Sequence, residues 1–390
     1  MSISDHTRLV PYCLCEGLPH GDTNVFNRVV RINVQVSLGL HLQINQAVPC
    51  DLIEHVFEKR NACFKGTISK AVEIQSDSNL GFGRVADNIG VTHRRNDTFG
   101  RMKPFWKPFL STLTPYVPGE QPKVEGLIKL NTNENPYPPS AKALEAMRQA
   151  VNDSLRLYPD PAATELKLNL SHRFGISPEQ VFVGNGSDEV LAFLFQALMG
   201  QAGGCAFPAI SYSFYPVYCK LYAIESKPFE LADDFSIDLS KVPQGAGSLI
   251  LPNPNAPTGI ALGTDAIAAH AHDHPHRLLV IDEAYVDFGA DSCVPLISQH
   301  ENLMVVQTLS KSRALAGLRL GFAFGPAELI EALERVKNSF NSYTVDRIAI
   351  AGAVAAIGDE AWFEANRLRV IENRDRLRQD LGNLGFEVLD

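Results

Sequence analysis

The apolar runs between about residue 130 and residue 340 constrain the fold more than any other feature of this sequence. Short apolar runs alternate there with stretches of helical periodicity, such as residues 189–199 and 263–270. This alternation is typical of parallel strands connected by helices, since a parallel pair needs a long crossover. We therefore predict an α/β fold with a mostly parallel sheet flanked by helices. The runs predicted as buried strands are residues 181–183, 248–251, 278–281, 304–308 and 320–324.

Residues 1–101 carry no motif that indicates chemistry. We expect residues 1–101 to be an N-terminal extension without a stable fold, and a small accessory domain is the alternative. Residues 102–130 are expected to form an arm that leads into a large domain at residues 131–345.

The C-terminal part, residues 346–390, is predicted to begin a smaller α+β domain. A long helical pattern runs from Ala349 through Asp380, and residues 386–389 read as a first strand. Because a strand needs a partner, we expect this domain to be truncated at Asp390.

Composition excludes several classes of protein. Hydrophobic residues make up 45% of the 390 positions, enough for a sizeable core and more than one domain. The net charge of -9 argues against a nucleic-acid or anionic-membrane partner. No apolar run reaches the roughly 18 residues that span a bilayer, and the N-terminus lacks a signal-peptide pattern. The seven cysteines include no CxxC pair, which predicts no metal site and reduced thiols in the cytoplasm.

Lys311 ends the sequence Thr-Leu-Ser-Lys, at the point where a predicted strand gives way to a loop. A lysine there can reach the crevice in which open α/β sheets bind ligands, and its amine can form a Schiff base with an aldehyde. Thr308, Ser310 and the following Arg319 suit a phosphate dianion. The short pattern alone is weak, because Lys70 repeats it without the arginine, and a surface lysine is the alternative.

A glycine-containing turn follows the predicted strand at residues 181–183. Gly186 lets the backbone approach an anion, and the free amides of Ser187 and Asp188 at the start of a helix point toward it. An ordinary capped helix is the alternative interpretation.

Two more strand ends carry polar groups. Asn255 lies in the turn Asn-Pro-Asn-Ala-Pro-Thr-Gly, where its amide can hydrogen-bond to a hydroxyl on the ring of a bound cofactor. Asp282 closes the strand at residues 278–281, and its carboxylate can pair with a protonated pyridine nitrogen, which keeps the ring an electron sink. Tyr285 can donate to the ring hydroxyl. Taken singly, these are a turn and a solvated strand end.

One cofactor, pyridoxal 5'-phosphate (PLP), explains all four elements in their order along the chain. With these motifs, residues 102–390 resemble the fold-type-I aminotransferases and, within them, the histidinol-phosphate aminotransferase family. Further similar segments are residues 113–116 (Leu-Thr-Pro-Tyr), 130–136 (Leu-Asn-Thr-Asn-Glu-Asn-Pro), 156–160 (Arg-Leu-Tyr-Pro-Asp) and 210–215 (Ile-Ser-Tyr-Ser-Phe-Tyr).

The resemblance implies a role for each candidate residue. Lys311 is the catalytic residue: it binds the cofactor as a Schiff base and shuttles a proton to and from the substrate α-carbon. Tyr212 stacks on the ring, Asp282 holds the pyridine nitrogen, and Tyr285 and Asn255 hold the ring hydroxyl. The phosphate is held by Gly186, Ser187, Asp188, Thr308, Ser310 and Arg319, with Tyr158 reaching across from the other subunit of a homodimer. Tyr116 and Asn133 are the implied substrate-binding residues.

The implied reaction moves an amino group between histidinol phosphate and 2-oxoglutarate in histidine biosynthesis. The cofactor motifs do not name the substrate, so an aromatic-amino-acid aminotransferase or a phospho-amino-acid decarboxylase is the alternative within this fold.

Two positions depart from the family pattern. Ala256 stands where relatives often have asparagine before Pro-Thr-Gly. The family's arginine for the substrate α-carboxylate has no match among the arginines between Arg335 and Arg378, so a catalytically impaired PLP-binding fragment is a further alternative.

Overall fold

The computed structural model describes residues 12–14, 31–36, 40–42, 105–121, 127–200 and 202–389. In the N-terminal part these are three short strands, of which β2 and β3 pair antiparallel. The rest of the predicted extension, including Lys70, lies outside the described residues. The N-terminal elements are β1 (Tyr12–Leu14), β2 (Arg31–Val36), β3 (Leu40–Leu42) and the 3-10 helix η2 (Pro108–Thr112).

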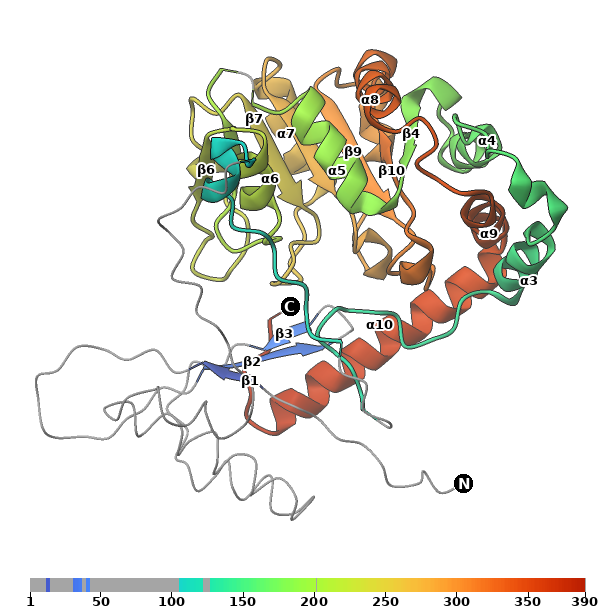
Figure 1. Ribbon diagram of the computed structural model, residues 1–390. Helices are drawn as coiled ribbons and strands as arrows, with labels where there is room; N and C mark the ends of the chain where they lie inside the picture. Colours follow the sequence, from blue (N-terminus) through green and yellow to red (C-terminus); the bar gives the residue numbers. More distant parts are fainter. Residues whose placement is uncertain are drawn as a thin grey trace, which may run out of the picture. The chain divides into compact units, whose positions relative to one another are not determined.

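A seven-stranded sheet with the order β4-β10-β9-β8-β7-β5-β6 forms the centre of the unit that includes Thr114–Asp390 (Figure 1). Strand β10 runs antiparallel to both its neighbours, and the other neighbouring pairs are parallel. The prediction of a mostly parallel α/β sheet is confirmed. The strands are β4 (Val181–Gly184), β5 (Cys205–Pro208), β6 (Ser226–Phe229), β7 (Ser248–Pro252), β8 (Leu278–Asp282), β9 (Leu303–Thr308) and β10 (Gly321–Phe324).

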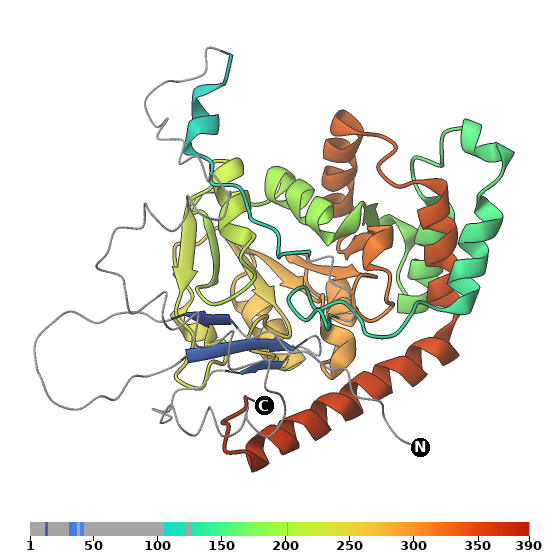
Figure 2. The same cartoon turned by 60° about the horizontal axis from the view of Figure 1, so that its bottom comes forward.

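Helices cover both faces of this sheet. Figures 1 and 2 show α5 lying across one of these faces. Alternation along β7 explains the two layers: Leu249 and Leu251 join one apolar cluster, and Ile250 joins the other. The first cluster includes residues of α4, α7 and α9, and the second includes residues of α5, α6 and α8. The helices are α3 (Ala141–Ala150), α4 (Thr164–Phe174), α5 (Gly186–Ala197), α6 (Tyr215–Leu221), α7 (Thr264–Asp273), α8 (Ala327–Phe340), α9 (Arg347–Gly358) and α10 (Glu360–Asn383).

The sheet register gathers the motif-bearing strand ends at one edge. Pro252 pairs with Asp282 at the ends of β7 and β8. Gly321, the first residue of β10, pairs with Thr308 at the end of β9 and with Gly184 at the end of β4. Because β10 runs in the opposite direction, the loop that precedes it reaches the same edge as the loops that follow the parallel strands.

The C-terminal part differs from the sequence prediction in two respects. The long helical pattern is two helices, α9 and α10, because Asp359 leaves the helical region at φ -97° and ψ 66°. The strand predicted at residues 386–389 is wrong: these residues are irregular, and Phe386 donates its backbone N–H to the Leu381 carbonyl at 3.1 Å. Within the described part of the chain these residues pair with no strand, and a strand requires such pairing.

Short 3-10 helices make several of the connections. They are η3 (Asp153–Arg156), η4 (Pro178–Gln180), η5 (Leu239–Lys241), η6 (Val286–Phe288), η7 (Val294–Ser298) and η8 (Ala316–Leu318). Within the described part of the chain, no helix is long and apolar enough to cross a membrane.

Candidate active site

Lys311 lies three residues after the end of β9 and is half-buried. Its Nζ donates to the backbone carbonyl of Thr132 at 2.9 Å and lies 3.4 Å from that of Asn133. The same amine is 5.4 Å from the centre of the Tyr285 ring. Asn135 fixes the other side of the loop by donating its side-chain amide to the Lys311 carbonyl at 2.9 Å. Lys311 is therefore a half-buried side chain held by hydrogen bonds rather than a freely solvated surface side chain.

Asp282 is buried at the end of β8, with 6% of its surface exposed. Its Oδ2 accepts from the Tyr215 hydroxyl at 2.8 Å, and its Oδ1 accepts from the Ala284 backbone N–H at 3.2 Å. Burial raises the pKa of Asp282 to about 6, and these two hydrogen bonds oppose that rise. A carboxylate with this environment can still pair with a cationic ring nitrogen, because ion pairing favours its charged form.

Asp188, in the first turn of α5, bonds to two other candidate residues. Its Oδ1 accepts from the Tyr212 hydroxyl at 2.9 Å, and its Oδ2 pairs with an Arg319 nitrogen at 2.8 Å. Burial, followed by the charge of Asp188, raises the pKa of Tyr212, so this hydroxyl stays a donor. From the sequence, only the backbone amide of Asp188 was expected to belong to the site. Its side chain holds Tyr212 and Arg319 in place together.

The first turn of α5 forms a narrow cradle against the start of β10. Gly186 has φ +82°, and a Cβ on it would lie 2.5 Å from the Arg319 Nη2. A Cβ on Gly321 would lie 2.3 Å from the Ser187 amide nitrogen. The N-cap residue Asn185 makes no side-chain cap bond, so no cap side chain occupies the first-turn amides. These amides and the positive end of the helix suit a phosphate.

Thr308 and Ser310 are both buried, but their hydroxyl groups have different roles. The Thr308 hydroxyl lies 3.1 Å from the Leu320 carbonyl and 3.1 Å from the Ser310 backbone nitrogen, which donates to it. It also lies 3.0 Å from the Ser310 hydroxyl. Thr308 thus links the loop after β9 to the loop before β10, and Ser310 is the hydroxyl that this link positions.

Two buried amide oxygens near these groups have no hydrogen-bond partner within the described chain. The Asn255 amide nitrogen donates to the Ile210 carbonyl at 3.1 Å, and Oδ1 is left unpaired. The Asn133 amide nitrogen donates to the Tyr285 hydroxyl at 3.0 Å, and its Oδ1 is likewise unpaired. Because buried polar atoms are normally satisfied, unpaired oxygens here fit a polar ligand in this crevice.

Tyr158 lies apart from this group, whereas Tyr116 adjoins it through Phe214, whose ring centre is 5.9 Å from that of Tyr212. Tyr158 is 78% exposed and stacks on Tyr343, with ring centres 4.6 Å apart. The ring of Tyr116 is 4.6 Å from that of Phe214, the residue before α6. The structure therefore brings the predicted cofactor residues together, except for Tyr158, which a single chain leaves on its surface.

Arg313 anchors the loop that carries Lys311 to α9 and α10. It was not among the site residues predicted from the sequence. Its buried guanidinium donates to the Ala356 carbonyl at 2.9 Å and to Glu360 at 3.3 Å. The guanidinium carbon lies 3.5 Å from the centre of the Phe363 ring. Only its place two residues after the lysine could have drawn notice, because its partners are more than 40 residues away.

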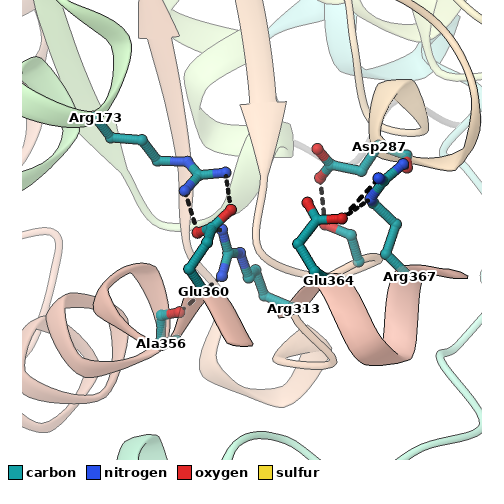
Figure 3. A network of polar contacts seen from close by, with 8 residues as sticks. Arg173, Asp287, Arg313, Ala356, Glu360, Glu364 and Arg367 are labelled. Atoms are coloured by element: carbon teal, nitrogen blue, oxygen red, sulfur yellow. Dashed lines mark hydrogen bonds and ion pairs between the residues drawn. The ribbon is translucent and has the colours of Figure 1, made fainter. Parts of the chain in front are cut away.

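Figure 3 shows how this contact extends across the α9–α10 junction. Glu360 lies between the guanidinium groups of Arg173 and Arg313. Glu364 pairs with Arg367 at 2.7 Å, and the Ser312 hydroxyl donates to the Asp287 carboxylate. The loop that carries the lysine is therefore bonded to α9 and α10 through Arg313 and to the 3-10 helix η6 through Ser312.

Comparison with known proteins agrees with the geometry of the site. The sequence matches the family model of class I and II aminotransferases over residues 125–390. It is 58% identical over 288 residues to histidinol-phosphate aminotransferase 1 of Bradyrhizobium diazoefficiens, covering 74% of this chain and 82% of that protein. It is 57% identical over 291 residues to the protein of the same name from Bordetella parapertussis, with coverages of 74% and 82%.

A solved structure supports the same assignment. Histidinol-phosphate aminotransferase from Sinorhizobium meliloti in complex with pyridoxal-5'-phosphate superposes with a TM-score of 0.59 at 26% identity, covering 64% of this chain and 69% of that one. The chain belongs to the class I and II aminotransferases. It is therefore an aminotransferase of a family that depends on PLP. The unpaired amide oxygens and the glycine cradle fit this cofactor.

Proposed function

We propose that this enzyme transfers the amino group of histidinol phosphate to 2-oxoglutarate, giving imidazole acetol phosphate and glutamate in histidine biosynthesis. The observation that carries the substrate assignment is the 58% identity, over 288 residues, to a relative that bears that name. The reaction class is supported separately, by the placement of Lys311 and Asp282 at one edge of the sheet.

In this proposal each end of the cofactor meets a different part of the crevice. Lys311 Nζ is the attachment point, Asp282 holds the pyridine nitrogen, and Tyr212 covers the ring face. The Tyr285 hydroxyl, which accepts from Asn133, keeps its own proton to donate to the ring hydroxyl. The groups at the phosphate are the amides of Gly186, Ser187 and Asp188, the Ser310 hydroxyl positioned by Thr308, and Arg319.

The cofactor supplies an electron sink for the substrate α-carbon. The chain supplies the proton transfers: Lys311 Nζ takes the proton from that carbon and later returns one. The carbonyls of Thr132 and Asn133 are within reach of this amine and orient it. Asn133 Oδ1 and the Tyr116 ring are the proposed contacts for substrate, and Asn255 Oδ1 is the proposed acceptor near the ring hydroxyl.

A homodimer is part of this proposal. Apolar side chains at residues 151–158 are exposed in the single chain, including Val151 at 59%, Leu157 at 52% and Tyr158 at 78%. Exposed apolar groups in such density are typical of an interface. A second copy seated here would bring Tyr158 toward the phosphate of its partner.

The free, buried thiols of Cys205, Cys219 and Cys293 support a reducing compartment, and we propose the cytoplasm.

The proposal is tested by comparing histidinol phosphate with phenylalanine as amino donor to 2-oxoglutarate. We expect a preference for histidinol phosphate in kcat/KM, and no turnover of either donor in Lys311→Ala. A preference for phenylalanine would establish the aromatic aminotransferase instead. Release of carbon dioxide from a phospho-amino acid would establish the decarboxylase. Cofactor binding without any turnover would establish the impaired PLP-binding fragment.

A further inference from the structure

Tyr215 connects two of the proposed cofactor-binding residues. It is the first residue of α6 and is fully buried. Its hydroxyl donates to Asp282 Oδ2 at 2.8 Å, and its ring meets that of Tyr212 edge-on, with centres 5.5 Å apart and planes at 82°. The rings of Phe207 and Phe195 pack around it at 6.0 Å and 6.5 Å. The aromatic cluster thus fixes the direction in which the hydroxyl points.

Among the residues that the structure describes, each of the two oxygens of Asp282 has one protein donor. The Tyr215 hydroxyl occupies Oδ2 and the Ala284 amide occupies Oδ1, so each oxygen keeps acceptor capacity for a further donor. We infer that Tyr215 is a positioning residue that keeps the Asp282 carboxylate ionised and oriented toward the pyridine nitrogen of the cofactor. The inference rests on the cofactor placement given under Proposed function.

The electrostatics around Asp282 explain why the carboxylate needs this donor. Burial raises the pKa of Asp282 to about 6, the Tyr215 hydrogen bond lowers it, Asp188 raises it and Lys311 lowers it. Tyr212 and Tyr218 also lie within electrostatic reach of this carboxylate. Burial, and then Asp282 itself, raise the pKa of Tyr215 well above its usual value, so its hydroxyl remains protonated and remains a donor.

The direction of the effect follows from the charge of the pair. A neutral Asp282 cannot hold a cationic ring nitrogen, so cofactor affinity falls as the pH drops through the pKa of Asp282. Without the Tyr215 hydroxyl that pKa rises, and the fall in affinity begins at higher pH. One hydrogen bond to a charged group corresponds to a shift of about one pH unit.

The test uses Tyr215→Phe, which keeps the ring and removes only the hydroxyl. Tyr218→Phe is the matched control, because Tyr218 is on the same helix but donates to the Asp188 backbone carbonyl at 2.8 Å. Each apoprotein is loaded with PLP labelled with nitrogen-15 in the ring, and the ring-nitrogen chemical shift is recorded. The PLP dissociation constant is measured against pH by absorbance.

In the wild type and in Tyr218→Phe we expect the shift of a protonated ring nitrogen. In Tyr215→Phe we expect the shift to move toward the unprotonated value, and the acid loss of affinity to begin about one pH unit higher. A nitrogen shift and pH profile in Tyr215→Phe equal to those of the wild type overturn the inference, as do equal changes in both variants. A wild type that binds no PLP would instead overturn the proposed function.

A crystal structure of the PLP-loaded wild type gives a reading that does not depend on the folding of any variant. The inference predicts the Tyr215 hydroxyl within hydrogen-bond distance of Asp282, and the same carboxylate on the ring nitrogen. A Tyr215 hydroxyl turned away from Asp282 in that structure would overturn it.

Discussion

Gly321→Ala should weaken both the fold and cofactor binding, because Gly321 touches the backbone of the proposed phosphate cradle. A Cβ there would lie 2.3 Å from the Ser187 nitrogen and 2.6 Å from the Gly186 carbonyl carbon. No side-chain rotation can relieve contacts with main-chain atoms. Since ordinary Cβ contacts begin at 3.4 Å, the first turn of α5 and the start of β10 must separate by about 1 Å, which displaces the first-turn amides.

The size of the effect follows from that displacement. Overpacking of this kind costs about 1–3 kcal/mol of unfolding free energy. A first-turn amide moved by about 1 Å from an ideal distance of about 2.9 Å no longer makes a hydrogen bond. A lost bond to a charged phosphate is worth about 1.5–3 kcal/mol, so PLP should bind roughly ten- to a hundredfold more weakly.

Urea unfolding followed by circular dichroism gives the first quantity, and absorbance titration of the apoprotein with PLP gives the second. Gly317→Ala is the matched control, four residues earlier in the chain, because a Cβ on Gly317 meets nothing within 4 Å. It should leave both measurements unchanged. A Gly321→Ala protein with the unfolding midpoint and PLP dissociation constant of the wild type would refute this reasoning.

Two further predictions concern stability. Arg313→Lys removes a planar, buried guanidinium from its aromatic and carbonyl contacts, and should lower the free energy of unfolding in urea by about 1–3 kcal/mol. The exposed control Arg335→Lys should lower it by less than about 0.5 kcal/mol. Equal losses in the two variants would contradict the role given to Arg313. Burial, then His274 and Arg277, lower the pKa of His270 from 6.5 to about 4, so the folded protein binds fewer protons than the unfolded chain between these values. The free energy of unfolding should therefore fall as the pH drops from about 6.5 to about 4, and in His270→Gln this decrease should be smaller by about 1–3 kcal/mol. The same pH dependence in the variant and the wild type would argue against a neutral His270.

The strands that carry the site were predictable from local sequence, because each is a short run of mostly apolar residues. The observed β8 extends the predicted strand by one residue, to Asp282 itself. Strands β5 and β6 were missed because β5, which reads Cys-Ala-Phe-Pro, has no β-branched residue, and β6, which reads Ser-Lys-Pro-Phe, is no apolar run. The antiparallel direction of β10 also has no local signal, since the loop that reverses the chain is held by a contact between Thr308 and Leu320.

The contacts between site residues could not be derived in the same way. Tyr215 and Asp282 are 67 positions apart, and Asp188 and Arg319 are 131 positions apart. Sheet order and register decide such pairings, and neither can be read from the periodicity of one strand. The strand expected at residues 386–389 failed for a related reason: a β pattern becomes a strand only where a neighbouring strand can pair with it.

The central claim is that Lys311 is the residue to which the cofactor is attached. Borohydride reduction of the PLP-loaded protein, followed by proteolysis and mass spectrometry, locates the attachment directly. Lys70, in the nearly identical sequence Thr-Ile-Ser-Lys, is the control within the same chain. The account predicts a phosphopyridoxyl group on the peptide that contains Lys311 and none on the peptide that contains Lys70. Modification of Lys70 in preference to Lys311, or an unmodified Lys311, would contradict it.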